Sequence, residues 1–146
     1  MSQSNMIQNL KSLLADSYSL YIKTQNYHWN VTGPHFKALH VLFEEQYTDL
    51  AVAIDTIAER IRSLGEKAPG TFRAYQEMSE IKDGDENARA SVMVKDLAED
   101  QQKILETLKI VLQSAQEVGD EVTIGLVVDR MTFHEKSHWM LISSLE

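Results

Sequence analysis

Four long stretches of the sequence carry apolar residues at intervals of three and four, and this spacing constrains the fold more than any other feature. Such spacing draws one apolar stripe along a helix. It predicts helices over residues of about 4–31, 35–64, 90–118 and 121 to nearly 146, with no strand pattern, internal repeat or low-complexity segment. In the first stretch the series is Met6, Leu10, Leu13, Leu14, Tyr18 and Tyr21.

The expected helix boundaries lie at the few residues that end or start helices. The chain has only 6 glycines and 2 prolines, and they cluster between the apolar series. Pro34 suits the first position of the second helix, and Gly65 suits its end. Gly119 is expected to end the third helix, and Asp120 to cap the fourth.

The lengths of the links predict how these helices are arranged. Short links join the first helix to the second and the third to the fourth, which makes each pair antiparallel. About 25 residues separate the pairs, enough to cross the length of a bundle, and Phe72, Tyr75 and Met78 predict one short helix there. We therefore expect an all-α, ferritin-like four-helix bundle with a short extra helix in the crossover, formed by one domain over residues 1–146. A four-helix protein of another role would show the same pattern.

Composition excludes several classes of protein. Hydrophobic residues make up 43% and charged residues 25%, as in globular proteins, and no apolar run is long enough to span a bilayer. The chain has no cysteine, so thiolate metal sites are excluded. Met1 to Leu10 show no secretory signal pattern, and together these features predict a cytoplasmic protein.

The second helix carries the residues that point to chemistry. His40, Glu44, Asp55 and Glu59 fall within an arc of roughly 100° on that helix, and His28 lies at the end of the helix before it. Imidazole with carboxylate and no thiolate suits Fe(II), Mn(II) or Zn(II). The alternative is a solvated acidic face with an incidental histidine, and this helix alone does not separate the two.

A longer set of residues resembles the sequence motif of the Dps family, the ferritin-like mini-ferritins named for DNA-binding protein from starved cells. The likeness begins in the first helix, runs through the second and continues into the last. It covers nearly the whole chain. The residues are His28-Trp29-Asn30-Val31-Thr32-Gly33, Phe36, Leu39-His40, Phe43-Glu44, Tyr47, Asp55, Ala58-Glu59-Arg60-Ile61-Arg62, Leu64-Gly65, His134-Glu135-Lys136 and Trp139-Met140-Leu141.

This resemblance implies a ferroxidase and iron-storage protein. It implies a dodecameric shell that oxidises Fe(II), with hydrogen peroxide preferred over oxygen, stores the ferric mineral and so protects DNA from oxidative damage. By the same resemblance His28, His40, Asp55 and Glu59 are iron ligands at the subunit two-folds, and Glu44 is an auxiliary ligand. Zn(II) or Mn(II) could substitute for iron there.

The resemblance also implies two further roles. Trp29 would lie beside the iron and could intercept radicals, although an ordinary buried aromatic residue would look the same in the sequence. Asp120, Glu121 and Asp129 would line an acidic pore at the three-fold axes. Gly125 stands where some relatives place another aspartate, which would make the pore wider or less negative.

Helix geometry predicts that an iron site built from these residues is shared between two chains. The alternative is that the histidines and the acids serve separate purposes. His40 and Asp55 are fifteen residues apart, which is about 22 Å along one helix, far beyond two metal–ligand bonds. A two-fold axis near Asp49 and Leu50 would bring His40 of one chain close to the acids of the other and create two equivalent sites.

Two other functions fit the sequence less well. A nucleoid-associated DNA-binding role is the main alternative, but the net charge of −8 and the absence of Lys and Arg in the first ten residues oppose direct DNA binding. The segment His134-Glu135-Lys136-Ser137-His138 matches a zinc-protease motif. The third histidine of the extended motif is missing, and both histidines continue an apolar stripe, so buried or interface histidines are the preferred interpretation.

Overall fold

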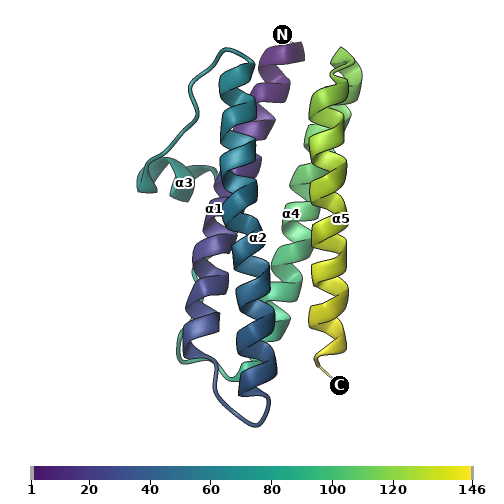
Figure 1. The fold of residues 1–146 in the computed structure, drawn as a ribbon. Helices are drawn as coiled ribbons and strands as arrows, with labels where there is room; N and C mark the ends of the chain where they lie inside the picture. The colour runs from purple at the N-terminus through teal and green to yellow at the C-terminus, as the bar shows by residue number, and fades with distance from the viewer. Residues whose placement is uncertain (1, 146) are drawn as a thin grey trace.

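Five helices make up the structure, a computed structural model that describes residues 2–145. Four long helices lie side by side, and one short helix lies outside them (Figure 1). They are α1 (Ser2–Asn30), α2 (Phe36–Ser63), α3 (Phe72–Met78), α4 (Ala90–Val118) and α5 (Glu121–Ser143). This confirms the predicted all-α bundle.

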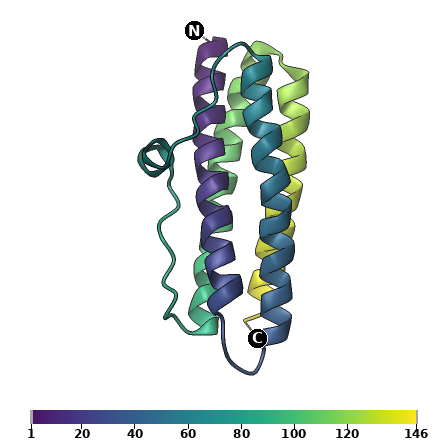
Figure 2. The same cartoon turned by 60° about the vertical axis from the view of Figure 1, so that its left-hand side comes forward.

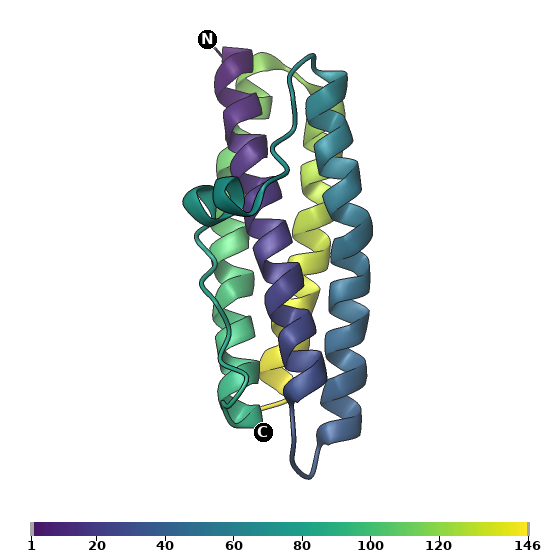
Figure 3. The same ribbon diagram turned by 90° about the vertical axis from the view of Figure 1, so that its left-hand side faces the viewer.

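The connections have the predicted topology. α1 and α2 form one antiparallel hairpin, and α4 and α5 form the other (Figure 2). The crossover leaves the end of α2, runs down the outside of α1 with α3 partway along it, and enters α4 at the opposite end of the bundle (Figure 3). The short helix predicted in this link is therefore confirmed.

One continuous apolar core fills the space between the long helices. Most residues of the predicted inner stripes are buried, although Tyr18, Tyr21, Ile54, Leu105 and Leu112 are only partly buried. Fully burying a leucine, isoleucine or phenylalanine contributes about 1.5–3 kcal/mol. The fully buried side chains include Leu10, Leu13, Leu14, Phe43, Ile57, Ile61, Leu97, Leu108 and Leu141.

Helix ends follow the expected residues with one exception. Gly119 adopts a left-handed φ of +72° and ends α4, and the side chain of Asp120 accepts a hydrogen bond from the amide of Thr123 and caps α5. The prediction that Pro34 is the first residue of α2 is wrong. Pro34 lies in a turn in which the Phe36 amide donates to the Gly33 carbonyl, a position that suits the fixed φ of proline, and α2 begins at Phe36.

Polar contacts fasten the crossover to the bundle at two levels. The buried carboxylate of Asp16 accepts hydrogen bonds from the Glu80 amide at 2.8 Å and the Thr107 hydroxyl at 2.6 Å. Burial raises the pKa of Asp16 above its usual value, although these hydrogen bonds oppose the shift. Further along α1, the amide of Asp85 donates to the hydroxyl of Tyr27. Both contacts hold the part of the crossover that follows α3.

Within the described range 2–145, no helix combines the length and the apolar character that crossing a membrane requires.

Candidate metal centre

His28 and His40 form a close pair at the end of the bundle where α1 leads into α2. Their rings stack with centroids 3.8 Å apart and planes 13° from parallel. Nδ1 of His28 lies 2.7 Å from the carbonyl oxygen of His40, and Nδ1 of His40 lies 2.7 Å from the carbonyl oxygen of His28. Since a carbonyl only accepts, each Nδ1 carries the hydrogen. In the neutral imidazoles, both Nε2 atoms are therefore left with lone pairs for a metal.

The turn between α1 and α2 produces this pairing. Gly33 has a φ of +116°, a conformation that L side chains rarely adopt, so the turn requires glycine there. The buried Val31 anchors the start of the link in the core. The chain then reverses within a few residues, which sets the last turn of α1 against the first turns of α2.

Aromatic rings cover the histidine pair on two sides. Phe36 stacks on His40 with centroids 4.9 Å apart, and Tyr47 meets His28 edge-on at 5.2 Å. His28 is buried, with 6% of its surface exposed, and His40 is half-buried. These contacts fix the ring planes before any metal binds, which lowers the ordering cost of binding.

Glu44 completes a cluster of three possible ligands. Each of the residues His28, His40 and Glu44 offers one ligand atom, and these three atoms lie within 4.8 Å of one another. Glu44 follows His40 by one helical turn and is exposed, so its carboxylate is free to rotate toward the two imidazoles. Two nitrogens and one carboxylate form the kind of open donor set that binds Fe(II), Mn(II) or Zn(II).

Asp55 and Glu59 are not part of this cluster. Both are exposed on α2, further along the same helix. Thr48, Ala51 and Val52 lie between them and Glu44, and these residues are also exposed, Val52 to 67%. Leu50, predicted to lie near a two-fold axis, is buried in the chain's own core. Leu50 therefore does not lie on the surface between the two sets of ligands. Thr48, Ala51 and Val52 form that surface.

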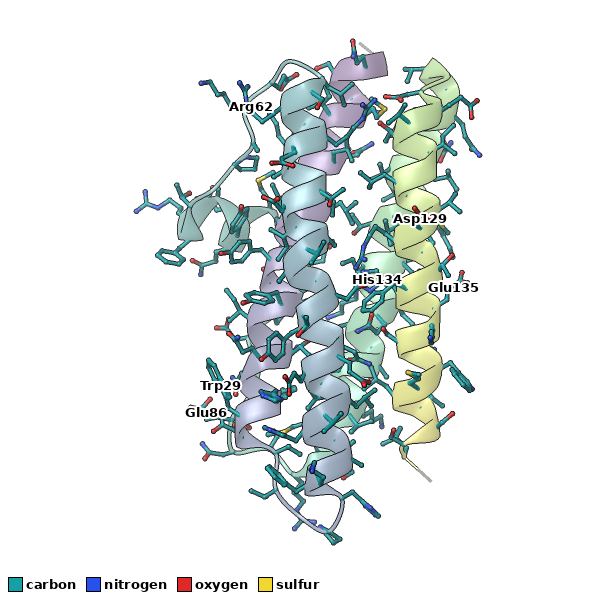
Figure 4. All side chains as sticks on the ribbon, viewed as in Figure 1. Trp29, Arg62, Glu86, Asp129, His134 and Glu135 are labelled. Atoms are coloured by element: carbon teal, nitrogen blue, oxygen red, sulfur yellow. The ribbon has the colours of Figure 1, made fainter. Side chains whose placement is uncertain are left out.

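His134 and His138 do not form a zinc-protease site. Figure 4 shows His134 pointing from α5 toward the neighbouring helices, whereas Glu135 points outward. Nδ1 of His134 lies 2.7 Å from the side-chain oxygen of Gln101, and its Nε2 lies 3.3 Å from the guanidinium of Arg130. Burial, with a smaller effect of Arg130, lowers the pKa of His134 well below its usual value. The preferred interpretation of His134 as a buried histidine is confirmed.

The residues predicted to line a pore lie at the start of α5. Both carboxylate oxygens of Asp120 accept hydrogen bonds from Arg60, at 2.9 and 2.8 Å. Burial alone would raise the pKa of Asp120, but the bonds from Thr123 and Arg60 hold it below its usual value. Glu121, Gly125 and Asp129 are exposed. These three residues are spaced four apart and therefore lie on one face of α5, with Gly125 between the two acids.

Comparisons with known proteins agree with this architecture. The family model of the ferritin-like domain matches residues 7–146. The DNA protection during starvation protein 2 of Bacillus anthracis is 40% identical over 136 residues, which cover 93% of this chain and 93% of that protein. The chain therefore belongs to the ferritin-like family, and within it to the Dps proteins.

Solved structures show the same fold. The crystal structure of a Dps protein from Bacillus brevis matches with a TM-score of 0.96 and 36% identity, covering 99% of this chain and 97% of that one. A Dps protein from Vibrio cholerae, described as a member of the ferritin-like diiron-carboxylate proteins, matches with a TM-score of 0.93 and 35% identity over 99% and 91% of the two chains.

One polar cluster, near the C-terminal end of α1, was not expected from the sequence. The ammonium of Lys23 lies 2.7 Å from a carboxylate oxygen of Asp100 and 3.0 Å from one of Asp96. Tyr27 donates a 2.6 Å hydrogen bond to Asp96. Burial raises the pKa of Asp100 to about 6, although Lys23 opposes the shift. The sequence signal for this cluster was a charged residue at an inward position of each helix, Lys23 on α1 and Asp100 on α4.

Proposed function

We propose that the protein is a ferroxidase that oxidises Fe(II) with hydrogen peroxide and stores the ferric product inside a dodecameric shell. The observation that carries this proposal is the histidine pair, whose mutual hydrogen bonds occupy both Nδ1 atoms and leave both Nε2 atoms for a metal, in a cluster with Glu44 whose ligand atoms lie within 4.8 Å of one another. Two Fe(II) ions supply the two electrons that reduce one peroxide to water, so no hydroxyl radical is released. The Dps protein from Vibrio cholerae is described as a member of the diiron-carboxylate proteins, and this similarity supports iron as the substrate.

We propose that each iron site takes ligands from two chains. His28, His40 and Glu44 would form one half, and Asp55 and Glu59 of a second chain the other. The exposed carboxylates of Asp55 and Glu59, which take no part in the histidine cluster, support this arrangement. A two-fold axis between the two halves would create two equivalent sites. Zn(II) or Mn(II) would occupy the same donors.

Ferroxidation is the first prediction. Fe(II) added without oxygen to the metal-free protein, followed by hydrogen peroxide, should give Fe(III) much faster than in protein-free buffer. Hydroxyl radical should stay low, because both electrons come from iron. Iron oxidation is followed by its absorbance, and hydroxyl radical by spin trapping. Rates equal to those in buffer would overturn the proposed function.

The second prediction concerns DNA. We propose that this cytoplasmic protein protects DNA by removing iron and peroxide and not by coating it. The net charge of −8 per chain should repel phosphate, and assembly adds these charges together. A gel-shift experiment with plasmid DNA at physiological salt and without divalent cations should show no retardation. Retardation that decreases as salt is raised would contradict this prediction and favour a nucleoid-binding role.

The third prediction concerns iron entry. We propose that Glu121 and Asp129 line an acidic pore at the three-fold axes, and that Asp120 contributes less because Arg60 neutralises it. Glu121→Gln with Asp129→Asn should slow iron uptake, since the face of α5 that they share then loses both charges. Asp120→Asn is the matched control, because asparagine also caps helices, and it should leave uptake nearly unchanged. Equal uptake rates in the wild-type shell and both assembled variants would refute the pore.

Trp29 is a further candidate near the proposed iron site. Its side chain is 64% exposed and points away from the bundle (Figure 4), so it is not the buried aromatic residue that the sequence left open. We propose that it intercepts radicals that reach the protein surface beside His28.

A further inference from the structure

A continuous row of aromatic rings leads away from the histidine pair. Tyr47 meets the ring of His28 at 5.2 Å, Tyr21 meets Tyr47 at 5.8 Å, and Tyr18 meets Tyr21 at 5.9 Å, all edge-on. Tyr75 then stacks on Tyr18 with centroids 4.8 Å apart and planes 23° from parallel. All these distances lie in the range of direct aromatic contact. The row therefore joins the metal centre to α3 without a gap.

The row crosses three helices and uses nearly every tyrosine of the chain. Tyr18 and Tyr21 are three residues apart on α1, so they share one face. Tyr47 comes from α2 and Tyr75 from α3. Of the 5 tyrosines in the sequence, only Tyr27 lies outside the row, where its hydroxyl is bonded to Asp96 and Asp85. Tyrosine is, with tryptophan, the side chain that loses an electron most readily in a protein without cysteine.

The far end of the row opens to solvent. Tyr18 and Tyr75 line a groove of about 1110 Å³ between α1 and the crossover. Their neighbours in this groove include Ser19, Lys23, Asn26 and Gln76. Water in such a polar groove can take up the proton that a tyrosine releases when it is oxidised. By contrast, the end of the row at Tyr47 is in contact with the buried His28.

We propose that Tyr47, Tyr21, Tyr18 and Tyr75 form a path that carries an oxidising equivalent from the iron site to the groove beside α3. This inference rests on the proposed function. It applies when peroxide meets a site that holds a single Fe(II), which supplies only one of the two electrons needed. Tyr47 supplies the second electron, so that Fe(II), a tyrosine, hydrogen peroxide and one proton give Fe(III), a tyrosyl radical and two water molecules.

The radical then moves outward by exchange between neighbours. Each tyrosyl takes an electron from the next tyrosine and regains a proton, and Tyr75 finally gives up its proton to water in the groove. Without this path the single electron from iron would convert peroxide to hydroxide and hydroxyl radical. The row therefore protects the site when iron is scarce, which is the condition in which the two-electron reaction fails.

The test uses the assembled protein with Fe(II) added below the number of sites, followed by hydrogen peroxide. Electron paramagnetic resonance of frozen samples reports the tyrosyl radical, and a nitroso spin trap with peptide mass mapping locates it. The wild-type protein should carry trap adducts mainly on Tyr75. Tyr21→Phe should lose the Tyr75 adduct, down to the level of Tyr75→Phe, and should gain an adduct on Tyr47. Tyr27→Phe is the matched control and should keep the wild-type pattern.

The outcomes separate this inference from the proposed function, because Fe(III) is measured in the same samples. Normal Fe(III) formation without a tyrosyl radical would overturn the path and leave the ferroxidase standing. A Tyr75 adduct that persists in an assembled Tyr21→Phe shell would also overturn it. If Fe(II) is not oxidised faster than in buffer, both proposals fall.

Discussion

Shells that contain both Asp55→Ala/Glu59→Ala chains and His28→Ala/His40→Ala chains should regain ferroxidase activity that neither parent possesses. In each parent every site lacks either its imidazoles or its acids, and iron oxidation should fall to the rate of protein-free buffer. In a mixed dimer one of the two sites combines intact histidines with intact acids. The expected activity per mixed dimer is therefore half that of the wild type.

Mixed shells test whether the two sets of ligands come from different chains, which a single substitution cannot do. His28, His40 and Glu44 gather within one chain, while Asp55 and Glu59 lie about 22 and 28 Å further along the helix than His40. A different affinity tag on each parent selects shells that hold both chains, and native mass confirms their assembly. Mixed shells that assemble but oxidise no iron would show that the histidines and the acids do not share a site.

Replacing Lys23 should strongly destabilise the folded protein. Lys23 and Asp100 are buried, with 4% and 1% of their side chains exposed, and their ion pair connects α1 to α4. Lys23→Met leaves the buried Asp100 carboxylate with only the more exposed ammonium of Lys103 at 4.0 Å, and breaking a buried pair typically costs about 3–5 kcal/mol. We expect the midpoint of thermal unfolding to fall on the order of 10 °C.

Two further variants test the cause of this loss. Lys23→Met combined with Asp100→Leu removes both charges and should recover most of the stability, because a buried pair replaced by apolar residues is often no less stable. Lys109→Met is the matched control, since its ion pair with Glu106 is exposed, and it should change stability by less than about 1 kcal/mol. All variants are compared at one protein concentration, because assembly affects the midpoint. Similar losses for Lys23→Met and Lys109→Met would refute the role of the buried pair.

The same pair gives stability a dependence on pH. In the folded protein, burial raises the pKa of Asp100 from 3.8 to about 6. Between these values the folded state binds more protons than the unfolded state, so the contribution of Asp100 is greatest below pH 3.8 and is lost as the pH rises through 6. Lys23→Met removes an interaction that favours the charged form, so its loss of stability should be smaller near pH 4 than at neutral pH.

Much of the fold could be predicted from the sequence because its determinants are local. The apolar spacing, Gly119 and Asp120 placed the long helices, and Phe72, Tyr75 and Met78 placed α3. The sequence did not determine the start of α2. Pro34 fits both a first helical turn and the turn before it, and only the hydrogen bond between Phe36 and Gly33 distinguishes the two.

The sequence by itself determined which residues could bind iron and that one helix could not bring them all together. A rise of 1.5 Å per residue separates His40 from Asp55 whatever surrounds the helix. Tertiary structure alone decided how the candidates are arranged. The hydrogen-bonded stacking of His28 on His40, the neutralisation of Asp120 by Arg60 and the row of tyrosines all join residues of different helices. Such contacts depend on how packed helices are rotated and aligned against one another, and the period of a single helix carries no information about either.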